Sequence, residues 1–172
     1  MPLIGCDMTH SPRAWALALT LAVAPLAPAI AQEANVNFGL LSQDTSLPVD
    51  IKADSLSVNN ADGSAVFSGN VLVGQGEMRL AASEVRVEYA PDSRAIRKLF
   101  ATGGVTLASG KDAAESREAD YTIDSGVVVM NGAVLLSQGP SVLTGDKLTI
   151  NLKNGSGVMS GGVSTTFVPG GN

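Results

Sequence analysis

The sequence predicts an all-β fold of about 12–16 short strands, built from a repeated unit of about thirty residues. Apolar and polar residues alternate over short stretches, and turn-forming residues separate the stretches at intervals of about 8–10 residues. Four alternating runs begin with a glycine followed two residues later by valine. These steps, spaced 34, 29 and 29 residues apart, are Gly69-Asn70-Val71, Gly103-Gly104-Val105, Gly132-Ala133-Val134 and Gly161-Gly162-Val163. Such a period is typical of stacked β architectures, and it favours a scaffold or a trough over an enzyme.

The glycines of these steps lie inside strand patterns, where glycine usually marks a bend or a close backbone approach. We interpret Gly69, Gly103, Gly132 and Gly161 as corner residues that let each strand turn between two sheets. They do not form a phosphate-binding loop, because no glycine-rich motif precedes a helical pattern.

An acidic residue stands at the head of a strand-like stretch in each repeat: Asp54, Glu84, Asp120 and Asp146. Carboxylates could bind calcium or hydrolyse a glycoside, but equivalent places in successive repeats favour a structural row along one outer rim. The sequence therefore predicts no catalytic residue, no metal site and no cofactor.

In the N-terminal half, turn residues separate six predicted strands. Pro48 precedes the first strand, and turn signals follow at residues 59–63, 74–76 and 90–93. The strand at 85–89 alternates most clearly, with valine and tyrosine on one face and arginine and glutamate on the other. The predicted strands are residues 49–51, 56–58, 65–68, 71–73, 78–80 and 85–89.

In the C-terminal half the strand pattern continues with one interruption. Residues 111–119 are polar and are predicted to form an exposed loop, with a helical turn as the alternative. The predicted strands are residues 96–101, 105–107, 121–123, 127–130, 134–136, 142–143, 148–150, 158–159 and 163–168.

Alternation places the apolar side chains of these strands on one face of a sheet. They either fill a sandwich core or line a cavity for an apolar ligand, and both roles require the same side chains. The shortage of large aromatic residues favours space between the sheets. The predicted interior residues are Val49, Ile51, Leu56, Val58, Phe67, Val71, Val73, Leu80, Val87, Val105, Tyr121, Ile123, Met130, Val134, Leu136, Leu148 and Ile150.

Residues 1–31 are predicted to be a cleaved signal peptide. Arg13 supplies positive charge, residues 14–27 are apolar, and Ala29-Ile30-Ala31 matches a small-x-small cleavage site, so the mature chain would begin near Gln32. A leader of this kind marks the chain for export.

Two questions about this leader stay open in the sequence. Translation can start at Met1 or at Met8, since the later start gives a shorter leader of more usual length. The alternative to cleavage is an uncleaved anchor helix, against which Pro25 and Pro28 argue.

The rest of the chain is predicted to be one domain. Residues 32–46 are expected to be flexible, residues 47–169 to form the β domain, and residues 170–172 to form a tail. The two ends of the domain carry short, little-charged strands, which are the kind of edge that a partner strand can extend. The predicted assembly residues are Val49, Ile51, Thr165 and Phe167.

Composition excludes several classes of function. The single cysteine, histidine and tryptophan, at positions 6, 10 and 15, all lie in the leader, so the mature chain has no thiolate, no imidazole base and no disulfide. Of 11 basic and 16 acidic residues, one of each lies in the leader, which leaves 10 and 15 and a net charge of −5. An acidic chain with few aromatic residues is not expected to bind nucleic acid.

The most specific motif of the chain is Phe-x-Gly-Asn-Val-x-Val-x-Gln-Gly at residues 67–76. Together with residues 47–54, 119–121, 129–136 and 144–148, it resembles the LptA/OstA family of periplasmic lipopolysaccharide-transport proteins. The resemblance covers residues 47–169 and implies a location in the periplasm of a Gram-negative cell.

The resemblance implies a twisted, open β-jellyroll, a V-shaped antiparallel roll of two sheets whose groove holds the acyl chains of lipid A. It also implies a non-enzymatic bridge that passes lipopolysaccharide from the inner to the outer membrane. The implied partners are an LptC-like inner-membrane protein, the N-terminal domain of an LptD-like outer-membrane barrel, and further copies of the chain joined head to tail.

Two other functions remain open at this point. An LptC-like anchored partner has the same fold but keeps its leading helix, which the cleavage motif opposes. A β-solenoid enzyme acting on carbohydrate would need a pair of carboxylates about 5–10 Å apart in a cleft.

Overall fold

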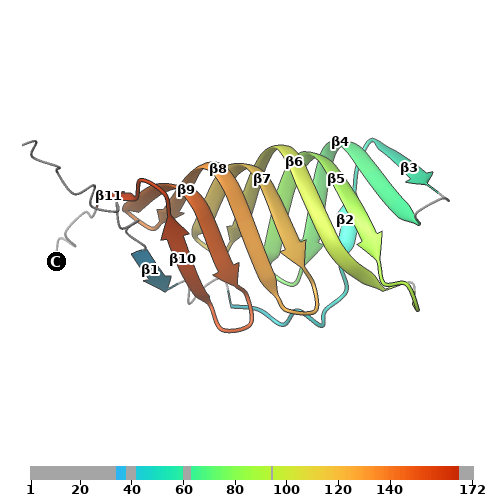
Figure 1. Cartoon of the computed structure of the whole chain (residues 1–172), viewed down its shortest axis with the longest axis horizontal. Coiled ribbons are helices and arrows are strands. Elements are labelled where there is room, and N and C mark those ends of the chain that lie inside the picture. Colours follow the sequence, from blue (N-terminus) through green and yellow to red (C-terminus); the bar gives the residue numbers. More distant parts are fainter. Residues whose placement is uncertain (1–33, 38–41, 60–62, 94, 167–172) are drawn as a thin grey trace, which may run out of the picture.

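The computed structural model describes residues 34–37, 42–59, 63–93 and 95–166, and these residues form strands, turns and loops without a helix (Figure 1). The strands are β1 (Ala34–Asn37), β2 (Asp50–Lys52), β3 (Ser55–Asn59), β4 (Ser64–Gln75), β5 (Met78–Tyr89), β6 (Ile96–Ser109), β7 (Asp112–Thr122), β8 (Val127–Gln138), β9 (Ser141–Asn151), β10 (Ser156–Ser160) and β11 (Ser164–Thr166).

All eleven strands pair antiparallel in one continuous sheet. Strands β4 to β9 follow one another as hairpins, because short turns join neighbouring strands. At one end, β2 and β3 both pair with β4, and at the other end β10 and β11 both pair with β9. Strand β1 then pairs with β10.

Each long strand bends at a corner, so that one sheet builds two layers. Pairing between β4 and β5 shifts between Ser68 and Val71, and each of the next four strand pairs has a shift at the same level. Layer A consists of β2, residues 71–75, 78–82, 105–109, 112–116, 134–138 and 141–145, and β11. Layer B consists of β3, residues 64–68, 84–89, 96–102, 118–122, 127–131 and 147–151, β10 and β1.

The corners are made by two consecutive residues with positive φ. The pairs are Gly69-Asn70, Gly103-Gly104, Gly132-Ala133 and Gly161-Gly162, with φ between 47° and 84°. Glycine adopts this conformation without steric cost, and a two-residue insertion opposite one residue is a β-bulge, which bends the strand. The interpretation of these glycines as corner residues is confirmed.

A neighbouring side chain lies directly over the first glycine of each corner; three of these side chains come from the adjacent strand, and Asp54 comes from the link between β2 and β3. A Cβ at Gly69, Gly103 or Gly161 would lie 2.5–2.6 Å from that side chain, so a larger residue would force a shift, and at Gly132 it would lie 3.0 Å from the Arg117 side chain. The facing pairs are Asp54 with Gly69, Ser83 with Gly103, Arg117 with Gly132, and Asp146 with Gly161.

The predicted row of acidic residues is therefore only partly present. Asp54 and Asp146 occupy equivalent corner places, but Ser83 and Arg117 fill the places between them. Asp120 lies inside layer B, 3.7 Å from the Lys98 ammonium. The corner requires a side chain that can cover glycine, and this can be acidic, basic or neutral.

The hydrophobic core lies between the layers. Alternate residues of every long strand point inward, and most of them are aliphatic. Tyr121 is the only aromatic side chain among the fully buried residues of the described chain. The core residues are Ala65, Val71, Val73, Met78, Leu80, Ala82, Val85, Val87, Leu99, Ala101, Val105, Leu107, Ala114, Ala119, Tyr121, Val128, Met130, Val134, Leu136, Leu143, Leu148, Ile150, Leu152 and Met159.

The all-β fold is as predicted, but the strands are fewer and longer than the predicted 12–16. Strands β4 to β9 contain 11 to 14 residues each, since pairing continues on both sides of the corner and joins two predicted short strands into one.

The prediction of a loop at residues 111–119 is wrong. Residues 112–122 form β7, which pairs with β6 and β8. Its inward positions hold Ala114, Ser116 and Ala119, which are too small to give a strong apolar signal, while its outward positions hold charged residues. The turn is confined to the residues around Gly110.

We expect alanine to be tolerated unequally at the two glycines of the second corner. Gly104 has φ of 84° and no neighbour within 4 Å of a Cβ. Gly104→Ala should lower the free energy of unfolding by about 1–2 kcal/mol, the cost of a left-handed L-residue. Gly103→Ala carries the same backbone cost and a contact of 2.6 Å with the Ser83 Cβ. It should lose about 1–3 kcal/mol more.

Urea unfolding of the two variants measures this difference directly. Because both glycines have nearly the same φ, equal destabilisation would show that the facing side chain does not constrain the corner.

Candidate functional site

The interior between the two layers holds nearly all the residues predicted to face inward. Eleven of them are buried: Val71, Val73, Leu80, Val87, Val105, Tyr121, Met130, Val134, Leu136, Leu148 and Ile150. Four more are partly buried and pack against the same core: Val49, Ile51, Phe67 and Ile123. Charged side chains lie on the outer faces or at the turns, apart from Asp112, which is 5% exposed. The interior is thus a mainly apolar strip, in which Gln75, Asp112 and three serines are the buried polar residues of the described chain.

The remaining two predicted residues, Leu56 and Val58, are 56% and 58% exposed. Leu56 pairs with Phe67 and Val58 pairs with Ala65, so both point to the interior side of layer B. They are exposed because β3 is the last strand of its layer and nothing described covers them. The apolar strip therefore reaches the surface at the β2–β3 end.

Sequence reasoning missed several interior residues. Met78, Val85, Leu99, Leu107 and Val128 are all buried to 1% exposure or less. They belong to the same alternating sets as predicted residues in the same strands, so extending each alternation to the whole strand would have found them.

The outer face of layer B carries a small cluster of charges around Phe100. The Arg86 guanidinium carbon and the Lys98 ammonium lie 4.3 and 4.2 Å from the centre of its ring. Glu88 accepts hydrogen bonds from Arg86 at 3.0 Å and from Arg97 at 2.8 Å. These cations are thus balanced by neighbouring carboxylates, and the cluster stabilises the outside of the layer.

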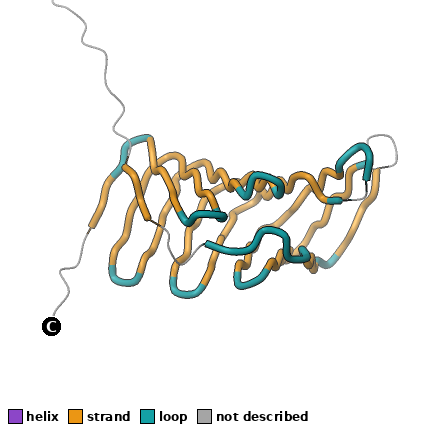
Figure 2. Tube along the Cα trace, turned by 90° about the horizontal axis from the view of Figure 1, so that it is seen from below, coloured by secondary structure: helices purple, strands orange, loops and turns teal. Residues whose placement is uncertain are grey.

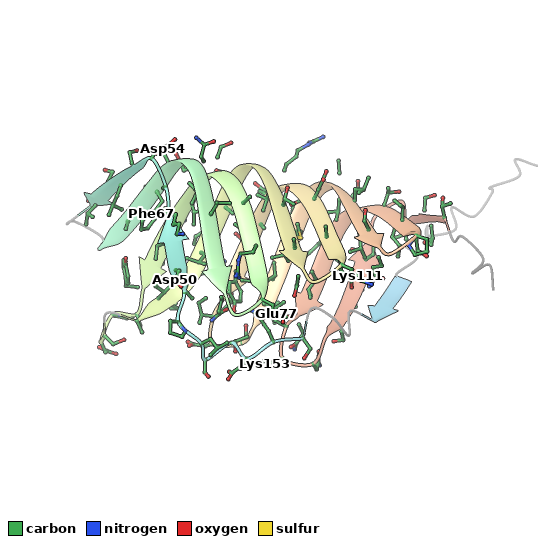
Figure 3. The ribbon with its side chains drawn as sticks, turned by 180° about the vertical axis from the view of Figure 1, so that it is seen from behind. Asp50, Asp54, Phe67, Glu77, Lys111 and Lys153 are labelled. Atoms are coloured by element: carbon green, nitrogen blue, oxygen red, sulfur yellow. The ribbon has the colours of Figure 1, made fainter. Side chains whose placement is uncertain are left out.

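One segment crosses the long side of the interior, where the hairpin turns of the two layers approach each other. We call residues 42–49 the strap (Figure 2). The Gln43 backbone N–H donates to the Leu152 carbonyl in layer B at 2.8 Å, and its side-chain oxygen accepts from the Met78 N–H in layer A at 3.3 Å. The strap therefore joins the two layers, and it runs between the turns that carry Glu77 and Lys153 (Figure 3).

A buried glutamine holds the strap in place. Gln75, 2% exposed at the end of β4, donates from its amide to the carbonyls of Thr45 and Leu47, both at 2.9 Å. Its side-chain oxygen accepts from the Tyr121 hydroxyl at 2.6 Å and from the Gln43 amide at 3.3 Å. Tyr121 lies in layer B, so this network also ties the layers directly. We call Gln43, Gln75 and Tyr121 the clasp.

Beside the strap lies a hollow of about 450 Å³. Its apolar lining comes from Leu47 and Val49 of the strap and from Ile96 and Ile123 on layer B. Val49, Ile96 and Ile123 are partly buried and pack against the core, so the hollow lies beside the apolar interior. Part of residues 32–46, expected to be flexible, thus makes specific contacts: residues 34–37 form β1, and residues 42–46 belong to the strap.

This geometry, an apolar strip between two layers of one bent sheet, can be compared with known proteins. The family model described as "LptA/(LptD N-terminal domain) LPS transport protein" matches residues 50–156. The chain belongs to this family. Its members act in lipopolysaccharide transport, so the resemblance seen in the sequence is confirmed.

Two similar proteins extend the comparison. An uncharacterized protein of Rhizobium meliloti (strain 1021) is 26% identical over 135 residues, which cover 74% of this chain and 73% of that protein. The crystal structure of LptH, the LptA homologous periplasmic component of the lipopolysaccharide transport device from Pseudomonas aeruginosa, matches with a TM-score of 0.66. The match has 17% sequence identity and covers 73% of this chain and 99% of LptH. This likeness shows the shared jellyroll fold.

Three of the four predicted assembly residues lie at the ends of layer A. Val49 precedes β2, and Ile51 in β2 pairs with Val73. Thr165 in β11 pairs with Leu143 at the opposite edge, and Phe167 lies outside the described residues. Layer B ends instead at β3 and β1.

The described residues contain no group of side chains that could hold a metal ion. None of the described segments is a helix long and apolar enough to cross a membrane. The predicted leader, residues 1–31, and the predicted tail, residues 170–172, lie outside the described residues.

We expect the stability of this protein to fall at high pH because of Tyr121. Burial raises the pKa of Tyr121 to about 12 from its ordinary value of 10.0, while a hydrogen bond from the Gln43 side chain lowers it. The unfolded chain releases the phenolic proton near pH 10, so this contribution is complete below pH 10 and is lost as pH rises toward 12. A shift of this size corresponds to about 3 kcal/mol.

The measurement is urea unfolding of the wild type and of Tyr121→Phe between about pH 9 and pH 12, the range over which the linkage acts. The comparison removes the effect of other groups that titrate in this range. Parallel pH profiles for the two proteins would contradict the assignment to Tyr121.

Proposed function

We propose that this chain is a periplasmic bridge protein that shields the acyl chains of lipid A between its two layers. In this role it passes lipopolysaccharide from the inner to the outer membrane. The observation that carries the proposal is the mainly apolar interior, which reaches the surface at Leu56 and Val58. The family match supports it.

The hydrophobic effect provides the affinity for such a ligand. Each acyl methylene hidden from water gains about 0.8 kcal/mol, so a lipid with several chains needs a continuous covered path. The interior offers this path along all the long strands, because every one contributes inward aliphatic side chains on both sides of its corner. Charged sugar and phosphate groups would stay outside the roll.

The partners follow from the two ends of the roll. An open sheet edge can accept another strand, which would continue both layers into a second copy or into a related domain. We propose that the β2–β3 end and the β11–β1 end join copies head to tail. The same ends would dock an LptC-like inner-membrane protein and the N-terminal domain of an LptD-like outer-membrane barrel.

Crosslinking tests whether the interior is the lipid site. A photo-crosslinking amino acid at Ile51, Phe67 or Val134 should capture lipopolysaccharide, because these side chains face the interior. The same group at Arg86 or Lys147, both exposed on the outside, is the control and should capture little. Equal capture at inner and outer positions, measured by gel mobility and lipid staining, would rule out the interior as the site.

A second experiment tests the edge model of assembly. Thr166 pairs with Val142 at the edge of layer A, and Thr166→Pro removes a backbone donor from β11. This variant, or a chain lacking residues 164–172, should still bind lipopolysaccharide but should fail to self-associate or to dock on the outer-membrane partner. Thr166→Val is the matched control, since it keeps the donor and suits a strand.

Size-exclusion chromatography with light scattering reports self-association of these variants. Normal assembly of both the proline variant and the shortened chain would disprove docking through β11.

A further inference from the structure

The interior between the two layers is packed, and both of its long sides are covered, one by the corners and the other by the strap. Most of its side chains are 0–1% exposed, so the two layers touch and a ligand must part them. At the corners the same strands run through both layers, so the layers are covalently joined there. They can separate only along the opposite long side, where the strap crosses between the hairpin turns.

The bonds of the strap lie at this opposite side. On layer A, Gln75 donates to the Thr45 and Leu47 carbonyls, and the Met78 N–H donates to the Gln43 side chain. On layer B, the Leu152 carbonyl accepts from the Gln43 N–H. Across the interior, the Tyr121 hydroxyl donates to Gln75. Separating the layers at this side requires these bonds to break.

Gln75 is the centre of the arrangement, because its side chain connects three parts of the molecule. Both donated bonds go to the strap, and its oxygen accepts from layer B and from the strap. A buried polar network in apolar surroundings is strong while every member is paired, and it weakens as a unit when one member is lost. Such a network can hold two apolar surfaces together until a ligand replaces the contacts between these surfaces.

The hollow beside the strap shows where a ligand would first enter. Leu47, Val49, Ile96 and Ile123 give it an apolar lining at the molecular surface, and three of these four pack against the core. Thr45, Asp124 and Lys153 complete its rim. An apolar wall that packs against the core, with polar residues beside it, suits one acyl chain of an amphiphile whose charged head remains in water.

We propose that this hollow is a side entrance for acyl chains and that the strap and the clasp form the latch that closes it. Gln75 is the positioning residue of the latch: it contacts the strap and Tyr121 and acts through them. The inference rests on the proposed function and adds a route: acyl chains enter across the long side of the roll, in addition to the path between docked copies. The ends remain free for docking.

The test compares the double variant Gln75→Leu/Tyr121→Phe with the wild type, both as the full mature chain. The double change removes the clasp and avoids a Tyr121 hydroxyl without a partner, so the fold is retained better than in Gln75→Leu alone. The matched control is Tyr89→Phe, which removes a tyrosine hydroxyl at the exposed end of β5, outside the clasp.

The first readout is amide hydrogen exchange, which follows the latch without any lipid. The N–H groups of Gln43 and Met78 bond across the latch. Their exchange should accelerate about tenfold in the clasp variant, the change expected for loss of a buried hydrogen bond, and should stay unchanged in the control. Unchanged exchange in the clasp variant would overturn the assignment of Gln75 as the residue that holds the strap.

The second readout is the rate of lipid uptake, with two probes. Fluorescently labelled lipopolysaccharide tests the proposed ligand, and cis-parinaric acid tests any acyl chain. Uptake of both should be several-fold faster in the clasp variant, with a smaller change in equilibrium affinity, because the latch limits access. If Gln75 and Tyr121 only stabilised the fold, the equilibrium affinity and the uptake rate would change together.

The outcomes separate the two proposals. Faster exchange with an uptake rate equal to the wild type would overturn the side entrance, since opening the latch would then not admit the ligand. If uptake of cis-parinaric acid is faster in the clasp variant but neither the wild type nor the variants bind lipopolysaccharide, the side entrance is supported and the proposed function is contradicted.

Discussion

The structure depends on one backbone device, the pair of positive-φ residues in the middle of each even-numbered long strand. Without these corners the hairpins would form a single flat sheet with one apolar face in water. With them, each strand crosses from layer A to layer B, and the apolar face closes on itself. The facing side chains Ser83 and Arg117 lie over the corner glycines of β6 and β8, so the bend is held from the outside by the neighbouring strand. The repeat of about thirty residues is one hairpin of this bent sheet, which explains why no repeat can be stable alone.

The corners also fix which residues point inward. In β4, residues 65, 71 and 73 face the interior. The inward residues are therefore odd-numbered on both sides of the two-residue insertion. In β5 the inward residues change from 78, 80 and 82 to 85 and 87, because Ser83 is the single residue opposite the insertion. A one-residue change of phase turns the next side chains back to the interior after the bend. Even and odd strands thus use different phases to reach one common interior.

The geometry of the corners explains which parts of the structure could be predicted from the sequence. Local signals, namely alternation and the glycine steps, predicted the all-β fold, the corners and most of the interior. The weak apolar signal of Ala114, Ser116 and Ala119 concealed β7, since burial there comes from its neighbours β6 and β8. The strap could not be predicted, because Gln43, Gln75 and Tyr121 meet only across sequence separations of 32 and 46 residues. Nothing in the local pattern of a glutamine indicates a partner so distant, and the polar segment around it is typical of a flexible linker.

The same side chains serve as core and as proposed binding site, and this dual role has a thermodynamic consequence. In the free protein the inward residues of layer A and layer B bury one another. An entering acyl chain replaces these contacts with similar apolar contacts, so the net gain is smaller than the burial of the chain alone. The hydrogen bonds of the clasp must break before an acyl chain can gain apolar contacts with the interior. This requirement favours a slow exchange between the closed and the loaded state. The proposed bridge between membranes would benefit from this balance, because a groove that bound acyl chains with the full hydrophobic energy would hold its cargo instead of passing it on.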